Sequence, residues 1–220
     1  MDTAVALVQA YLQVNGYFTV AEYPVLEARR GQARSVTDLD MLAFRFAHPG
    51  HDVKKGRGRR PLTGHPLVPD PVLGCPADQP DMIVGEVKEG SARFNAAARD
   101  PVVLEVALAR FGCCERSHVG QLTQQLLAEG RAVTPAGHTV RMVAFGEGSG
   151  ITEHAWTCVP MRHVVEFLQA HLREHWEVLR HAQIREPAFG VLALIEKWGV
   201  RPAVDAGRPR PLQRRPDGSM

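Results

Sequence analysis

The sequence predicts a mixed α/β fold in which helices cover both faces of one mixed β-sheet. Three observations predict it: a helical apolar period near the N-terminus, five short strand-like runs, and further helical runs between and after these strands. In chain order they read helix, three strands, helices, two strands and helices. The length of 220 residues, 45% of them hydrophobic, suits one globular domain over residues 1–200.

The first helix is predicted over residues 3–14, and two strands follow it. Apolar side chains recur there at the spacing of one buried helix face. They are Ala4, Leu7, Val8, Tyr11 and Leu12. Asn15-Gly16 ends the helix. The two strands are expected over 17–25 and about 36–46, on either side of a polar turn.

Residues 47–80 are predicted to be a long insertion, because they are rich in proline and glycine and lose all periodicity. The insertion contains a basic run, Lys54, Lys55, Arg57, Arg59 and Arg60. Such a run can contact the phosphate backbone of a nucleic acid. A solvated loop without a ligand explains it equally well.

The remaining elements follow from the same patterns. The third strand is predicted over 82–88. Asp100-Pro101 combines a cap residue with proline at the first helical position, which opens a helix to about residue 111. The later elements are a helix over 117–129, strands over 138–146 and 155–159, and helices over about 161–183 and 188–198. The Pro/Arg-rich tail over 201–220 is predicted to be disordered.

The composition argues against several classes of protein. A formal net charge of +2 is too small to indicate nucleic-acid binding by itself. The four cysteines lack the spacing of a zinc ribbon or a disulfide framework, which favours a reduced, cytoplasmic setting. Residues 3–14 lack the cationic start and cleavage pattern of a signal peptide. No apolar run approaches the roughly 18 residues that cross a bilayer, so no membrane partner is expected.

A carboxylate and an amine lie two residues apart in the third predicted strand. Because side chains alternate between the two faces of a strand, Glu86 and Lys88 project side by side from one face. The chain has four lysines against twenty-two arginines, so lysine is not its usual cation. The pair is therefore a candidate site, but taken alone it is explained at least as well by an exposed ion pair on the surface of a strand.

A second carboxylate is expected beside this pair. If the strand over 36–46 pairs with the strand over 82–88, Asp40 stands next to Glu86 and Lys88. Asp38 shares the face of Asp40 and is a candidate outer-shell group. Asp81 is a rival for the role of Asp40, but its odd offset from Glu86 directs it to the opposite face unless a bulge intervenes.

Two carboxylates on adjacent strands suit Mg²⁺, which prefers few protein carboxylates and several waters. A neighbouring ammonium suits phosphoryl chemistry. Beside a scissile phosphate, Lys88 can offset the charge that develops in the transition state and can orient or activate the attacking water. Lysine can also give up a proton, whereas arginine effectively cannot.

These residues resemble those of the PD-(D/E)xK nuclease superfamily, which includes restriction endonucleases and Holliday-junction resolvases. The resemblance is carried by Thr37-Asp-Leu-Asp-Met-Leu-Ala43, by Gly85-Glu-Val-Lys88 and by an αβββαβ order over about residues 3–146. It implies a restriction-endonuclease-like core with extra C-terminal helices. It also implies a metal-dependent nuclease that hydrolyses phosphodiester bonds, with DNA as the expected substrate.

The resemblance assigns roles to individual residues. Asp40 and Glu86 would bind Mg²⁺ or Mn²⁺, the carbonyl of Val87 would add a third ligand, and Lys88 would be the catalytic amine. Some members carry a glutamate on the first helix, where this chain has Gln9 or Gln13 as accessory candidates. About forty residues separate the two motif strands, where many members have a short hairpin.

Other readings stay open. A catalytically inactive nucleic-acid-binding or interaction module of the same fold would keep these features, and the sequence leaves a homodimer undecided. His171-Leu-Arg-Glu-His175 matches the inverted zinc-peptidase motif. That family needs a further downstream glutamate in a larger fold, so ordinary helix histidines are the favoured reading.

Overall fold

The computed structural model describes residues 2–29, 32–50, 53–54, 61–62, 67, 69–76, 78–148 and 155–200. Of the predicted basic run, only Lys54 falls within these ranges. Lys55, Arg57, Arg59 and Arg60 lie outside the described residues, and so does the predicted tail over 201–220.

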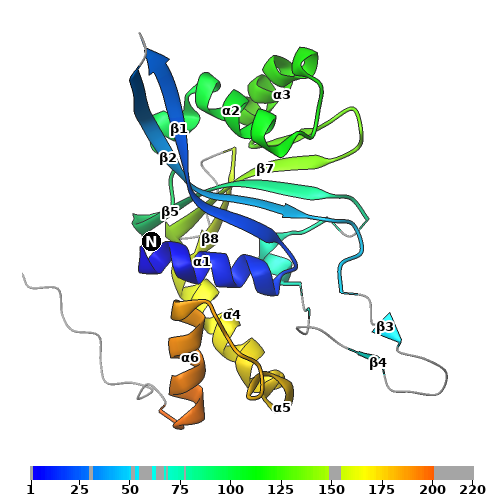
Figure 1. Ribbon diagram of the computed structural model, residues 1–220, viewed down its shortest axis with the longest axis vertical. Helices are drawn as coiled ribbons and strands as arrows, with labels where there is room; N and C mark the ends of the chain where they lie inside the picture. Colours follow the sequence, from blue (N-terminus) through cyan, green and yellow to red (C-terminus); the bar gives the residue numbers. More distant parts are fainter. Residues whose placement is uncertain are drawn as a thin grey trace, which may run out of the picture.

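The helices and strands follow the predicted order closely (Figure 1). The N-terminal half contains α1 (Thr3–Val14), β1 (Phe18–Arg29), β2 (Gln32–Arg45), β3 (Val53–Lys54), β4 (Pro61–Leu62), the 3₁₀ turn η1 (Pro71–Leu73) and β5 (Asp81–Ser91). The rest contains η2 (Ala97–Arg99), α2 (Pro101–Phe111), α3 (Arg116–Glu129), β6 (Arg131–Val133), β7 (Thr139–Glu147), β8 (Thr157–Pro160), α4 (Met161–Glu174), α5 (Trp176–Leu179) and α6 (Pro187–Lys197).

One mixed sheet forms the centre of the fold. Its strands lie in the order β1-β2-β5-β7-β6, and β8 also pairs with β7. β1, β2 and β5 are antiparallel neighbours, whereas β5 and β7 run parallel. Parallel neighbours need a long crossover connection, and α2 and α3 supply it. The predicted mixed α/β sheet flanked by helices is therefore confirmed.

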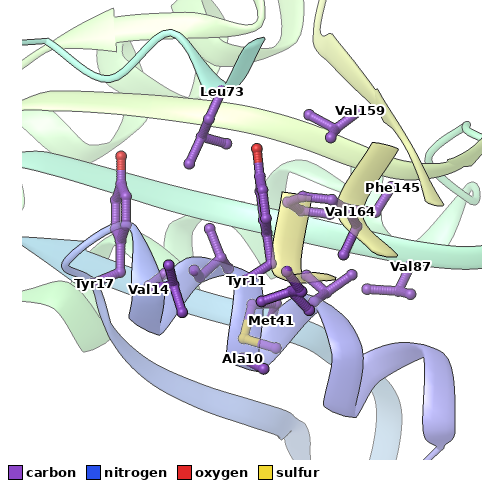
Figure 2. Packing of buried hydrophobic residues seen from close by; sticks show 14 of the residues in the cluster. Ala10, Tyr11, Val14, Tyr17, Met41, Leu73, Val87, Phe145, Val159 and Val164 are labelled. Carbon is purple, nitrogen blue, oxygen red and sulfur yellow. The ribbon is translucent and has the colours of Figure 1, made fainter. Parts of the chain in front are cut away.

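Each face of the sheet buries its own hydrophobic cluster. On one face, α1 and α4 pack over residues such as Met41 and Phe145 (Figure 2), and α6 packs against α1 and α4. On the other face, α2 and α3 pack over residues such as Leu42 and Val84. Neighbouring residues of β2 and β5 thus enter opposite clusters, as the two-residue period of a strand requires.

Asp81, the first residue of β5, belongs to a buried ion pair rather than to an open site. Arg141 of β7 donates from Nε to Asp81 Oδ1 at 3.0 Å and from Nη2 to Oδ2 at 2.7 Å. The hydroxyl of Tyr17 donates to the same carboxylate. Arg141 Nη1 also donates to the carbonyl of Leu73 at 2.8 Å, which holds η1 against the sheet.

Several local features differ from the sequence prediction. β1 and β2 extend to Arg29 and back to Gln32, beyond the predicted ends at residues 25 and 36. The short strand β6 forms a hairpin with β7 around Thr134–Gly137, and three residues give too little alternation to be recognised. The helix predicted over about 161–183 is interrupted, because His175 leaves the helical conformation at φ −107° and ψ 20°. Leu172 and Leu179 nevertheless enter the same cluster, so the apolar period continues across the break.

The described helices include none that is both long and apolar enough to cross a membrane.

Candidate functional site

Asp40, Glu86 and Lys88 meet at one end of the β2–β5 pair. Met41 and Gly85 are the last paired residues there, so Asp40 and Glu86 lie just beyond this pair on adjacent strands. The Nζ of Lys88 lies 2.5 Å from Glu86 Oε1 and 3.8 Å from Asp40 Oδ2. The three residues that the sequence singled out therefore form one cluster.

The face of the sheet on which this cluster lies follows from alternation along β5. Met82 and Val84 pack with α2 and α3, whereas Ile83 and Val87 pack with α1. Glu86 is in phase with Met82 and Val84, so it belongs to the α2–α3 side. Gly85 faces the other side, where a Cβ would lie 3.0 Å from the Cβ of Met41. Glycine thus permits close approach of the two strands beside the cluster.

Asp40 is held by the backbone of the neighbouring strand. Its Oδ2 accepts a hydrogen bond from the Val87 N–H at 2.8 Å. The side chain is 23% exposed and also lies near the Lys88 ammonium. The carboxylate satisfies a backbone donor just beyond the last β2–β5 pair, which fixes where Asp40 sits.

Glu86 is an almost fully buried acid, with 1% of its side chain exposed. Its Oε1 accepts from Asn95 Nδ2 at 2.7 Å and pairs with Lys88. Its Oε2 is buried and has no hydrogen-bond partner in the described part of the chain. Burial, reinforced by the nearby Asp40 charge, raises the pKa of Glu86, and the opposing effects of Lys88 and Asn95 do not cancel the rise.

This raised pKa has a consequence for stability that Glu86→Gln can expose. A carboxyl whose pKa is higher when folded stabilises the protein below its ordinary pKa, and that contribution is lost as the pH rises through the folded pKa. The neutral glutamine escapes this loss. We expect Glu86→Gln to melt above wild type at neutral pH, with the difference vanishing near or below about pH 4.

Thermal unfolding in a chelator between acidic and neutral pH measures this effect. A variant that melts below wild type by the same amount at every pH would contradict it, since the loss would then come from packing rather than from ionisation.

The donor set fits a hard divalent cation. Two carboxylates converge, and the buried Oε2 of Glu86 lacks a partner. Because Lys88 Nζ lies 2.5 Å from Glu86 Oε1 and 3.8 Å from Asp40 Oδ2, these two oxygens are at most 6.3 Å apart. Among the described residues, no group of three or more His, Cys, Asp and Glu side chains could hold a metal ion. A cation here would therefore rely on two carboxylates and on water, as Mg²⁺ commonly does.

The predicted accessory residues lie elsewhere. Gln9 and Gln13 each donate from Nε2 to Thr19 Oγ1 at 3.2 Å, which ties α1 to β1. They belong to the α1 side of the sheet, opposite Glu86. Asp38 is exposed, and its carbonyl accepts from Thr37 Oγ1 at 3.4 Å. The structure thus brings together Asp40, Glu86, Lys88 and the backbone of Val87. The side chains of Gln9, Gln13 and Asp38 are not part of this cluster.

The contact between Asn95 and Glu86 was not predicted from the sequence. Asn95 lies after β5, and its Oδ1 accepts from the Ala98 N–H at 2.7 Å while its amide donates to Glu86. Asparagine two residues before a helical turn, here η2, is a cap signal that can be recognised in a sequence. Its contact with Glu86 depends on how the chain folds back after β5, which no local pattern encodes.

The histidines of the zinc-peptidase motif lie on α4 and at its end. His171 is buried against the α1–α4 cluster, where its ring stacks on Phe167 at 6.4 Å. The ring of His175 is 4.7 Å from that of His171. These contacts are those of aromatic side chains packed between helices.

No protein-family model matches this chain, and comparisons with curated proteins and with solved structures gave no match either.

Proposed function

We propose that the protein is a metal-dependent nuclease that hydrolyses phosphodiester bonds in DNA. One observation carries this proposal: a lysine ammonium contacts two carboxylates on adjacent strands, one of which keeps a buried oxygen without a partner. A surface ion pair would leave both carboxylates in solvent. Burying Glu86 at the cost of a raised pKa is typical of a functional acid.

The arrangement of elements supports a restriction-endonuclease-like core. α1 is followed by three strands of the central sheet, β1, β2 and β5, then by α2 and α3, and then, after the short strand β6, by β7 in parallel with β5. This is the αβββαβ order of the PD-(D/E)xK nucleases that the two motifs resemble. The insertion between β2 and β5 and the helices after β8 would be additions to that core.

Asp40 and Glu86 would hold Mg²⁺ or Mn²⁺, with Glu86 offering Oε2 and the carbonyl of Val87 as the further ligand implied by the resemblance. The metal ion would supply Lewis-acid charge and a more acidic bound water. Lys88 is 37% exposed, so its ammonium can meet a phosphate at the protein surface. There it would stabilise the negative charge that develops on the phosphoryl oxygens and orient the attacking water.

The proposed setting is cytoplasmic, with DNA as the partner. The four cysteines, all within the described residues, are free thiols, which suits a reducing compartment. Lys54, Lys55, Arg57, Arg59 and Arg60 would contact the DNA backbone, since they fall between the two motif strands in sequence.

A catalytically inactive nucleic-acid-binding module is the second candidate. The observation that favours it is the direct Lys88–Glu86 pair, because an ammonium at 2.5 Å neutralises the buried carboxylate without a metal ion. Both candidates predict DNA binding, and only the nuclease predicts metal-dependent strand cleavage.

A substrate panel tests the proposal. Linear duplex, branched duplex, single-stranded DNA and RNA would each be incubated with the protein in Mg²⁺, in Mn²⁺ and in a chelator. We expect DNA cleavage that requires the divalent cation. Binding without cleavage of any substrate would favour the inactive module, and cleavage that persists in the chelator would contradict the metal site.

A further inference from the structure

We propose that Asn95 is a positioning residue that orients the Glu86 carboxylate so that Oε2 is the oxygen offered to the metal ion. The inference rests on the proposed function, since it concerns the same site. Asn95 itself would touch neither the substrate nor the metal ion.

The orientation of the Asn95 amide is fixed from both sides. The Ala98 N–H donates to Oδ1 at 2.7 Å, so the other end of the amide must be the donor. That donor, Nδ2, lies 2.7 Å from Glu86 Oε1. A flipped amide would place an acceptor against the carboxylate and a donor against the N–H, losing both hydrogen bonds.

The hydrogen bond from Asn95 fixes the plane of the Glu86 carboxylate, and so fixes which of its two equivalent oxygen positions lacks a partner. Oε1 receives both Asn95 and Lys88, whereas Oε2 is buried without a partner in the described chain. Because only 1% of the side chain is exposed, bulk water has little access to take over the role of Asn95. Rotation of the carboxylate would give up the amide contact, so Oε2 is held as the open ligand.

The segment that carries Asn95 is anchored on both sides of it. Phe94 is buried and meets the ring of Trp156 edge-on at 5.3 Å. Ala98 is fully buried within the α2–α3 cluster. These contacts fix the backbone before and after Asn95, which is the support that a second layer of residues gives to a metal ligand.

Titration of the metal-free full chain with Mn²⁺ by calorimetry tests this role without relying on activity. Asn95→Ser and Asn95→Thr keep a side-chain oxygen that can accept from the Ala98 N–H, but neither reaches Glu86. We expect their Mn²⁺ affinity to fall by about 10- to 100-fold. The Mn²⁺ affinity can be interpreted if at least one of the two variants melts near the wild-type temperature.

Asp100→Ala is the matched control. Asp100 caps α2 through the Val102 N–H at 2.8 Å and is exposed, so its removal loosens the same region without touching Glu86. We expect it to lower the melting temperature and leave Mn²⁺ affinity unchanged. Wild-type affinity in both Asn95 variants, or an equal loss in Asp100→Ala, would overturn the positioning role alone. A wild-type chain that binds no Mn²⁺ would overturn the proposed function and this role with it.

Discussion

Replacing Lys88 by methionine is expected to slow the proposed metal-dependent DNA cleavage by about 10²- to 10⁴-fold, the range typical of a positioned catalytic group. Lys88 contacts two carboxylates, at 2.5 Å from Glu86 and 3.8 Å from Asp40. Methionine keeps much of the length of the side chain and removes its charge. The loss of cleavage rate should therefore come from removing the ammonium and not from creating a cavity.

The same variant should bind Mn²⁺ at least as tightly as wild type, because the positive charge of the ammonium next to Glu86 Oε1 repels a cation bound to the same carboxylate. Lys197→Met is the matched control, since Lys197 is an exposed residue at the end of α6. Cleavage rates measured under single-turnover conditions would decide the matter. A Lys88→Met enzyme that cleaves like the Lys197→Met control would remove Lys88 from the catalytic step.

Breaking the buried Asp81–Arg141 pair is expected to destabilise the fold by about 3–5 kcal/mol, because either single change leaves an uncompensated buried charge. Asp81 is fully buried, and the guanidinium of Arg141 also holds the Leu73 carbonyl. Asp81→Ala therefore leaves Arg141 without its carboxylate, and Arg141→Met leaves the buried Asp81 carboxyl without its guanidinium. Urea unfolding measures both.

The double variant Asp81→Ala/Arg141→Met should be less destabilised than the sum of the single changes, since neither charge then remains. The exposed pair Arg162–Glu166, at 2.8 Å on α4, provides a contrast. Glu166→Ala is expected to change stability by no more than about 0.5 kcal/mol. If Asp81→Ala or Arg141→Met lowered stability by no more than Glu166→Ala does, the buried pair would not be needed to hold β5 and β7 together.

Regular alternation made much of the sheet and of the candidate site predictable from the sequence. The odd offset between Asp81 and Glu86 correctly separated them onto opposite faces, because period two is a property of any extended strand. The positions of Glu86 and Lys88 followed from the same period. Asp40 followed from assuming that the strands on either side of the insertion are neighbours, which the Met41–Gly85 pairing confirms.

What the sequence did not predict depends on contacts between distant segments. The Asn95 amide reaches Glu86 only because the chain turns back after β5, and Asp40 meets the Val87 N–H only because β2 and β5 stop pairing there. Gln9 and Gln13 were accessory candidates from their place on the first helix. They bind Thr19 instead because α1 covers the other face of the sheet.

The position of a bound Mn²⁺ tests the central claim most directly. Crystals of the protein grown with Mn²⁺ can be measured at a wavelength where manganese scatters anomalously, which identifies the ion without reference to activity. The proposed site predicts one anomalous peak bonded to carboxylate oxygens of both Asp40 and Glu86. A peak elsewhere, or none while Lys88 still pairs with Glu86, would contradict it.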